Sequence, residues 1–356
     1  MKIGLDLRFL KNWDNYSNFV YNLVKNLINN DKDNEYIIFL NLSFSHINFW
    51  ENTKNIIVNN ANIFDKQIKF KKILDKEKLD QTIFFNYDKP LKYRCNYIMF
   101  IADLEEFHFS PKKNIIKKHF DNYLLSENSK HANKIVCFNE KIKIEINDKL
   151  NIFEDNIKIL TPFFITEKIE QSNFNIDIRS KYNIQNNYLI YYFWPKESSN
   201  LDRIIEIFEE FKKQEINLSL VILDNLTTQD INLRKKVIEK QLNSHIHFIW
   251  EVDKTEKELF FKNSIWVLFP VLYTIFPFAL SDALSFENKI IASNLENIKK
   301  IFWNKISYFN PTDINVMFNQ ILNFTQDNKS NKINYNFINE KYNIEKTTGE
   351  LINILK

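Results

Sequence analysis

The sequence predicts an α/β protein built from two doubly wound, parallel-sheet domains that face each other across a cleft. Short apolar strands alternate with helical segments in the first half of the chain, and the second half repeats this alternation. Between the halves, the segment that starts at Thr161 breaks the pattern and is interpreted as a linker. The length of 356 residues is also that of about two domains.

The first half begins with a short strand, KIGLDL, at residues 2–7. Residues 15–29 are expected to form a helix, because Phe19, Leu23 and Leu27 recur at helical spacing. Further strand signals are EYIIFL, NIIVN, QTIFFN, NYIMFI and KIVCF. A helix is expected between the last two of these, over residues 114–125.

The second half starts with the expected strand YLIYYFW, followed by LSLVIL and HIHFIW. Asn200 is interpreted as the N-cap of a helix whose apolar residues begin at Leu201, and a further helix is expected over 255–263. The chain then closes with helices over 312–323 and 339–356.

The stretch from Ser264 to Asn294 is expected to form a strand, a turn, a short helix and a second strand. The apolar run IWVLFPVLY gives the first strand, which ends near Pro270, and KIIAS gives the second. The run over 265–280 is also apolar enough to suggest a membrane-spanning helix, but its two prolines and its place within a βα pattern argue against one. Ligands of open α/β sheets bind at the carboxyl ends of the strands, so the turn that carries Thr274 and Pro277 is a candidate site.

Composition excludes several classes of function. Only two glycines occur, which excludes a glycine-rich phosphate loop and leaves Asn and Asp to supply left-handed turns. The net charge of +3 is dispersed, so nucleic acid is not expected as a partner. Two cysteines in apolar strands indicate free buried thiols, and the N-terminus is typical of a first strand. We expect a cytoplasmic protein, with contact to a membrane surface left open.

Taken together, the segments resemble the GT-B glycosyltransferases, which have two Rossmann-like domains, and specifically the retaining family 4. The resemblance rests on IGLDLRFL, HANKIVCFNE, IRSKYNIQNNYLIYYFW, HIHFIWEVDKTEKELFFKNSIWVLFPVLY and YNIEKTTGELINIL. It implies an acceptor-side domain over 1–165, a nucleotide-sugar donor domain over 166–338, and a helix over 339–356 that returns toward the first domain.

The family's donor motif, E-G-F-G-L-P-x-L-E-A-M, falls on residues 274–284. Thr274 stands where the family has the Glu that contacts the sugar, and Phe276 keeps the motif's aromatic position. Asp282 replaces the Glu that holds the ribose hydroxyls; it is equally explained as an acidic residue in the first turn of a helix. Pro277 removes a backbone N–H from this loop.

The family's E-P-R-K-N element, whose cations neutralise the leaving diphosphate, is also changed. A gap-free comparison places the basic pair on Ser198 and Ser199, whereas a two-residue insertion lets Lys196 supply one cation. The alternative interpretation of Lys196 is a solvated loop lysine.

In the first domain, the family's glycine turn aligns with Asn15 and Ser17, and asparagine can hold a left-handed turn. The family's His-Asp pair becomes Ala102 and Asp103, so Asp103 is the remaining candidate catalytic residue, or else a turn residue.

Two functions remain open. The first is a hexosyltransferase-type glycosyltransferase that moves a sugar from a nucleotide-diphosphate sugar to a glycan or lipid-linked acceptor in surface polysaccharide synthesis, without a metal or other cofactor. The second is a catalytically inactive, glycosyltransferase-like subunit that binds a partner glycosyltransferase or an acceptor. His245 and His247 point to one face of a strand but lack further ligands at suitable spacing, so no metal site is expected.

Overall fold

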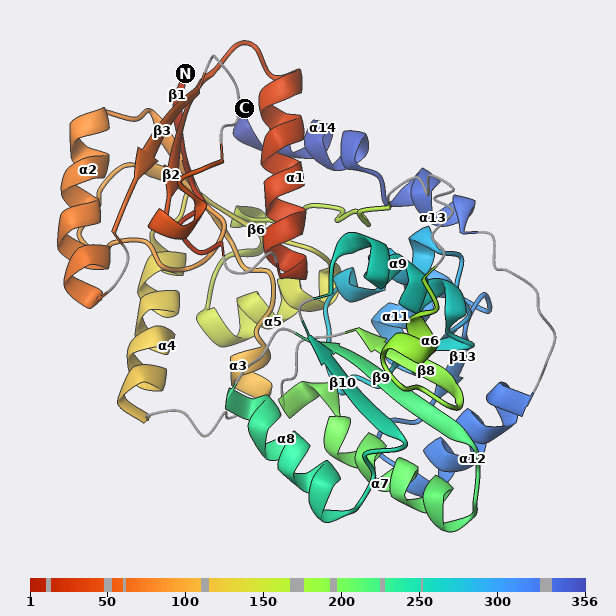
Figure 1. Cartoon of the computed structure of the whole chain (residues 1–356). Helices are drawn as coiled ribbons and strands as arrows, with labels where there is room; N and C mark the ends of the chain where they lie inside the picture. The colour runs from red at the N-terminus through yellow and green to blue at the C-terminus, as the bar shows by residue number, and fades with distance from the viewer. Residues whose placement is uncertain are drawn as a thin grey trace. The chain divides into compact units, whose positions relative to one another are not determined.

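The computed structural model describes residues 1–10, 14–47, 53–59, 62–109, 115–166, 176–192, 197–224, 228–250, 252–326 and 335–356. The chain divides into two compact units. Unit 1 contains Met1–Phe163 together with Tyr342–Lys356, and unit 2 contains Phe164–Lys341. Each unit is built around one parallel sheet (Figure 1).

Unit 1 holds a seven-stranded sheet with the order β3-β2-β1-β4-β5-β6-β7, and every neighbouring pair in it is parallel. Its strands are β1 (Lys2–Asp6), β2 (Glu35–Leu40), β3 (Thr53–Ile57), β4 (Gln81–Phe84), β5 (Asn96–Phe100), β6 (Lys134–Cys137) and β7 (Ile157–Ile159). Most positions of the central strands are buried and apolar, because helices cover both faces of a doubly wound sheet.

The helices of unit 1 connect these strands, and α1 and α2 lie on opposite sides of them in Figure 1. They are α1 (Asn15–Asn30), the π-helical turn η2 (Asp65–Lys69), α2 (Phe70–Glu77), α3 (Glu105–His108), α4 (Ile115–Lys130) and α5 (Glu140–Leu150), with short 3₁₀ turns η1 (Leu42–Phe44) and η3 (Glu154–Asn156). The sequence placed the first of these helices within one residue of its observed bounds.

The last helix, α14 (Ile344–Leu355), belongs to unit 1 and packs beside α1 (Figure 1). Its Glu350 carboxylate accepts hydrogen bonds from the Thr161 amide at 2.7 Å and from the Thr161 hydroxyl at 3.1 Å. Leu351 on the same helix is fully buried. The end of the chain is therefore part of the core of unit 1.

Unit 2 holds a six-stranded parallel sheet with the order β10-β9-β8-β11-β12-β13. Its strands are β8 (Asn187–Tyr192), β9 (Leu218–Asp224), β10 (Ile246–Trp250), β11 (Trp266–Phe269), β12 (Ile290–Ser293) and β13 (Ser307–Phe309). Its helices are α6 (Ile178–Lys181), η4 (Glu197–Ser199), α7 (Leu201–Lys213), α8 (Thr228–Glu239), α9 (Lys254–Asn263), η5 (Phe278–Leu280), α10 (Ser281–Ser285), α11 (Glu296–Phe302), α12 (Ile314–Gln326) and α13 (Asn336–Lys341).

The prediction of two doubly wound parallel-sheet domains is confirmed. The alternative of a spanning helix over 265–280 is wrong, because this run forms β11, a loop and the turn η5. Among the described residues, no helix is long and apolar enough to cross a membrane.

The expected use of Asn and Asp in left-handed turns is correct only in part. Positive φ occurs at Asn151, Asn183 and Asn200, but also at five other non-glycine residues, namely Lys78, Glu215, Gln241, Glu287 and Trp303. Asn200 stands at the predicted N-cap position of α7, but it has a φ of 65° and its side chain makes no capping hydrogen bond. Its side-chain amide instead donates to the Pro311 carbonyl at 2.8 Å, which anchors the start of α7.

Candidate functional site

The strand order of unit 2 reverses direction between β8 and β11, which are hydrogen-bonded neighbours. The loops that leave the carboxyl ends of such a strand pair diverge to opposite faces, and ligands of open α/β sheets bind between them. The two loops are tied together here, since the Leu272 amide donates to the Ser198 carbonyl at 2.7 Å. The sequence-predicted donor residues after both strands therefore belong to one region.

The loop after β11 is shaped by its own polar groups. The Thr274 hydroxyl donates to the Phe276 carbonyl at 3.1 Å, so this side chain holds the turn. The Asn297 amide of α11 donates to the Thr274 carbonyl and, at 3.1 Å, to the Ile275 carbonyl. The sequence analysis did not single out Asn297, because it lies outside the family's donor motif. Its place in the first turn of the helix that follows β12 was the available signal.

Phe276 is nearly buried rather than presented to solvent. Its ring packs against Phe164 with a centroid distance of 4.5 Å and against Phe278 at 4.8 Å. The rings of Phe164, Phe276 and Phe278 therefore form one aromatic cluster at this loop.

Asp282 lies in the first turn of α10, as predicted, with its side chain partly exposed. The Lys257 ammonium of α9 forms an ion pair with its Oδ2 at 2.7 Å. A carboxylate that is to bind ribose hydroxyls would share its oxygen atoms with this lysine. Lys257 was missed from the sequence, where nothing marks it among the other lysines of its helix.

The region after β8 is described only from residue 197 onward, and Lys196 lies outside the described residues. Ser198 and Ser199, which occupy the basic positions of the family, are each 1% exposed. Buried hydroxyls supply no cation for a diphosphate, so neither serine replaces the lost basic pair. The Tyr191 hydroxyl donates to the Ser199 carbonyl at 3.4 Å, which ties this turn back to β8.

The strand order of unit 1 reverses between β1 and β4, and its predicted site residues lie near this point. Asn15 and Ser17 are the first and third residues of α1, so the expectation of a left-handed turn at Asn15 is wrong. Asp14 caps the helix instead, with its carboxylate accepting from the Ser17 amide at 2.7 Å. An Asp immediately before a helix satisfies the exposed amides of the first turn, and this removes the need for a glycine turn.

Tyr16 connects this helix start to the carboxyl edge of the sheet. Its hydroxyl donates to the Phe85 carbonyl after β4 at 2.7 Å. Burial, followed by the nearby carboxylates of Asp103 and Asp14, holds the pKa of Tyr16 well above its usual value. Tyr16 was missed from the sequence, although it lies between two residues that were singled out.

Asp103 is exposed in the loop after β5, where its carboxylate accepts a hydrogen bond from the Glu105 amide at 3.1 Å. This contact gives it the turn role that was the alternative interpretation. Asp103 follows β5 and α1 follows β1, so both lie at the carboxyl edge of the parallel sheet of unit 1. The structure thus brings Asp103, Asn15 and Ser17 to one region of unit 1.

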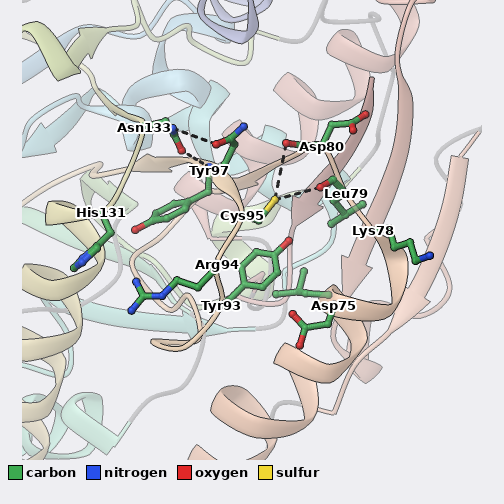
Figure 2. A pocket seen from close by; sticks show the side chains of 12 residues that line it. Asp75, Lys78, Leu79, Asp80, Tyr93, Arg94, Cys95, Tyr97, His131 and Asn133 are labelled. Atoms are coloured by element: carbon green, nitrogen blue, oxygen red, sulfur yellow. Dashed lines mark hydrogen bonds between the residues drawn. The ribbon is translucent and has the colours of Figure 1, made fainter.

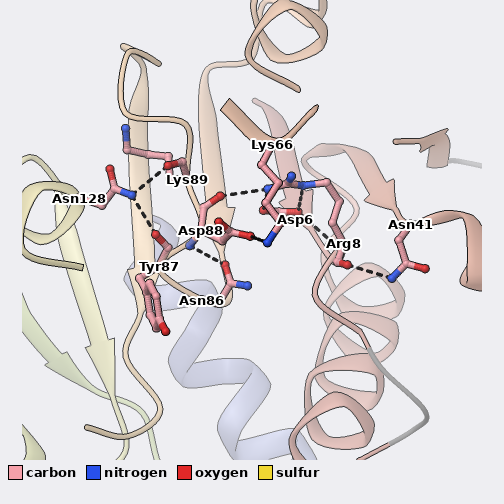
Figure 3. Close-up of polar contacts among 9 residues, drawn as sticks. All are labelled: Asp6, Arg8, Asn41, Lys66, Asn86, Tyr87, Asp88, Lys89 and Asn128. Atoms are coloured by element: carbon pink, nitrogen blue, oxygen red, sulfur yellow. Dashed lines mark hydrogen bonds and ion pairs between the residues drawn. The ribbon is translucent and has the colours of Figure 1, made fainter. Parts of the chain in front are cut away.

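A buried polar network underlies this edge of unit 1 (Figure 3). Arg8 and Asp6, each about 2% exposed, form two parallel bonds of 2.8 Å. The Arg8 guanidinium also lies 3.4 Å from the centre of the Phe70 ring and donates to the Asp88 carbonyl at 3.1 Å.

Two further contacts join neighbouring loops to this network. The Lys66 ammonium reaches the Asp88 carboxylate at 2.7 Å, and the Asn41 amide donates to the Arg8 carbonyl at 2.9 Å. The network thereby fixes the loops after β1, β2 and β4 relative to one another.

Among the described residues, no group of three or more His, Cys, Asp or Glu side chains is placed to hold a metal ion. His247 is partly buried, and burial lowers its pKa. The absence of a metal requirement stays a prediction.

Two parallel-sheet units with their polar loops at the switch points define the GT-B class of fold. Solved structures share this fold over essentially the whole chain. The structure of sucrose-phosphate synthase from Thermosynechococcus elongatus has a TM-score of 0.79 and 10% identity, covering 100% of this chain and 98% of that one. Anabaena HepE in complex with UDP-glucose has a TM-score of 0.74 and 12% identity, covering 100% and 99%. WaaG, a glycosyltransferase involved in lipopolysaccharide biosynthesis, has a TM-score of 0.74 and 11% identity, covering 99% of each chain.

Within unit 2, residues 175–341 match the family model described as Glycosyl transferases group 1. No curated protein matches the chain in sequence. The resemblance to GT-B glycosyltransferases is confirmed by this match and by the shared fold. The retaining, family 4 assignment stays a prediction, as do the roles of the individual site residues.

Proposed function

We propose that this protein is a hexosyltransferase-type glycosyltransferase that transfers a sugar from a nucleotide-diphosphate sugar to a glycan or lipid-linked acceptor. The observation that carries the proposal is the pair of hydrogen-bonded loops at the β8/β11 switch point, inside the segment that matches the family model. Support also comes from HepE, a protein of the same fold whose structure contains UDP-glucose.

In this proposal the donor lies against the loops of unit 2. Thr274 and Phe276 shape the loop that receives the diphosphate sugar, and Asp282 binds the ribose hydroxyls after Lys257 gives up part of its contact. Lys196 supplies a cation for the departing diphosphate. For unit 1, the proposal keeps Asn15 and Ser17 as donor-binding residues and Asp103 as the catalytic residue. The leaving diphosphate helps to deprotonate the acceptor, and no metal takes part.

The experiment that tests the proposal is a calorimetric screen of the purified protein against UDP, GDP, ADP and dTDP and their sugars. Ligand that binds only the native protein raises its apparent stability by mass action, so weak sites register at millimolar ligand. One nucleotide should bind, and Asp282→Ala should abolish that binding. Asp313→Ala, at a carboxylate that caps the start of α12, is the matched control and should leave it unchanged. A folded protein that binds none of the panel would overturn the donor site.

A second function, an inactive subunit that binds a partner glycosyltransferase or an acceptor, is favoured by the polar groups already engaged in internal contacts. The Asp282 carboxylate is paired with Lys257, the Thr274 hydroxyl closes its own turn, and Ser198 is buried. Binding of a nucleotide sugar without its hydrolysis or transfer to any acceptor would support this function.

We further place the protein in the cytoplasm, in surface polysaccharide synthesis, with peripheral contact to the inner face of a membrane. A lipid-linked acceptor would present its sugar at that surface. Co-sedimentation with vesicles that contain anionic lipid, set against neutral vesicles, tests the membrane contact. Failure to bind either kind of vesicle would contradict the proposed membrane contact.

A further inference from the structure

A pocket lies in unit 1 at the amino ends of the strands, away from the predicted site residues at the carboxyl ends (Figure 2). Its wall includes Asp80, just before β4, and Asn96, the first residue of β5. Asn133, just before β6, completes this row at the amino ends of three neighbouring strands. The pocket has a volume of 720 Å³, within the range of small-molecule sites. It is independent of the proposed transferase function, which uses the carboxyl ends of the strands.

Two cationic side chains of the pocket have no polar partner in the described part of the chain, whereas its carboxylates are hydrogen-bonded. Within the described part of the chain, the side chains of Arg94 and Lys78 make no hydrogen bond or ion pair. The Asp75 carboxylate is paired with Lys71 at 2.5 Å, and the Asp80 carboxylate accepts from the Lys2 amide at 2.7 Å. The pocket thus offers free cationic donors, while its carboxylates are already hydrogen-bonded.

His131 adds a further nitrogen to the pocket wall. Its Nδ1 lies 2.9 Å from the Glu127 carbonyl, which fixes the ring and leaves the opposite nitrogen for another partner. In Figure 2, Arg94 and His131 are drawn toward one side of the pocket and Lys78 toward the other. Guanidinium and imidazolium N–H groups are both hydrogen-bond donors suited to an anionic oxygen group.

The floor of the pocket is fixed by buried residues. The Tyr97 hydroxyl donates to the Asn128 carbonyl at 2.6 Å, and the Tyr93 hydroxyl lies 3.2 Å from that of Thr82. Cys95 lies between these tyrosines in the sequence, is partly exposed, and points its Sγ to the Leu79 carbonyl at 3.3 Å. Buried hydrogen bonds therefore hold the floor of the pocket beside Arg94.

Lys78 has a φ of 50°, in the left-handed region, where it ends α2. A non-glycine residue in this region carries a strain of about 1 kcal/mol or more. A left-handed residue is a common way to end an α-helix, and Lys78 also lines the pocket.

We propose that this pocket binds a small molecule that carries a phosphate group. The Arg94 guanidinium donates hydrogen bonds to two phosphate oxygens through its fork, the doubly protonated His131 ring donates its Nε2–H to a third, and Lys78 reaches the rest of the ligand from the opposite wall. The volume of the pocket leaves room for an organic part as large as a sugar or a nucleoside.

Cys95 supplies the readout, because it lines the pocket while the other cysteine does not. Cys137 is fully buried, and burial raises the pKa of its thiol to about 12, so it stays unreactive in the native protein. The experiment follows alkylation of Cys95 in the full-length Cys137→Ser protein by mass spectrometry. The probes are inorganic phosphate, glucose 6-phosphate and AMP, with glucose and adenosine as uncharged counterparts.

The phosphate-bearing probes should slow the alkylation of Cys95, by about tenfold at a concentration of about ten times Kd, because only the free protein reacts. Arg94→Gln should weaken this protection by about 10- to 100-fold in probe concentration, since a charge-assisted pair is lost. Lys92→Gln, at an exposed residue that does not line the pocket, is the matched control and should keep the protection. Asp282→Ala should also keep it, which separates this pocket from the donor site.

Three results would overturn the proposal. The first is an alkylation rate that none of the phosphate-bearing probes changes up to millimolar concentrations. The second is protection of the same strength in Arg94→Gln, because the anion would then be held elsewhere. The third is equal protection by glucose and adenosine, which would show that the pocket does not recognise a phosphate group.

Discussion

Removing either member of the Asp6–Arg8 pair should destabilise unit 1 by about 3–5 kcal/mol, because the remaining charge is left buried and unpaired. The magnitude follows from the geometry: both side chains are 2% exposed and are joined by two bonds of 2.8 Å. For a unit of this size, the loss corresponds to a fall in Tm of about 6–20 °C. Differential scanning calorimetry of Asp6→Leu and Arg8→Met measures it.

The double variant Asp6→Leu/Arg8→Met should recover a large part of the loss, since no lone charge remains in the interior. Glu127→Gln is the control for a pair of similar length at the surface of the same unit, where Lys130 lies 3.1 Å from Glu127. It should cost less than about 1 kcal/mol. Single variants as mild as this control, or a double variant as unstable as the sum of the singles, would refute the reasoning.

Three other predictions concern single side chains. Lys89 is 1% exposed and donates to the Pro90 and Tyr93 carbonyls, and burial lowers its pKa to about 8. Between pH 8 and its ordinary pKa the native state binds fewer protons than the unfolded state, so the stability of the wild type relative to Lys89→Met should rise with pH by about 3 kcal/mol. Urea unfolding across this range measures the difference, and a flat difference would contradict it. Asn297→Ala removes two hydrogen bonds to the Thr274–Ile275 backbone and should weaken nucleotide binding, measured by calorimetry, about tenfold. The control Asn319→Ala, on an exposed helix face, should leave the affinity unchanged. Equal affinities of the two variants would mean that this loop does not take part in donor binding. Leu351→Ala should lower the free energy of unfolding in urea by about 2–5 kcal/mol, because Leu351 is fully buried. The control Asn353→Ala, at an exposed residue of the same helix, should lower it by less than about 0.5 kcal/mol. Similar values for the two variants would mean that α14 is not part of the core.

The fold could be predicted because its signals are local and repeated. Runs such as EYIIFL and LSLVIL coincide with β2 and β9, since a strand covered on both faces needs a continuous apolar segment. Helix bounds followed from apolar spacing, as for α1. The order of strands in each sheet and the positions of switch points depend on pairings between distant segments, which no single stretch of sequence specifies.

The candidate site could be predicted less well, because a motif gives positions and not partners. The sequence singled out Asp282 without showing that Lys257 would bind it, and Thr274 without Asn297. Both partners come from other helices and are contacts of tertiary structure. Asn15 shows a second limit: the family resemblance predicted a left-handed turn at this residue, but Asp14 caps a helix there. Local capping chemistry outweighed the family pattern.

The division of the chain has a consequence for the order in which the protein folds during synthesis. Unit 2 is one uninterrupted segment, Phe164–Lys341, whereas unit 1 needs Tyr342–Lys356 in addition to Met1–Phe163. While the ribosome is still adding residues, unit 2 can complete its core before unit 1 receives α14. Until then, the apolar face of α1 that α14 covers stays open to water or to a chaperone, as is common for proteins of several domains. The slow step of maturation should therefore belong to the unit that is translated first.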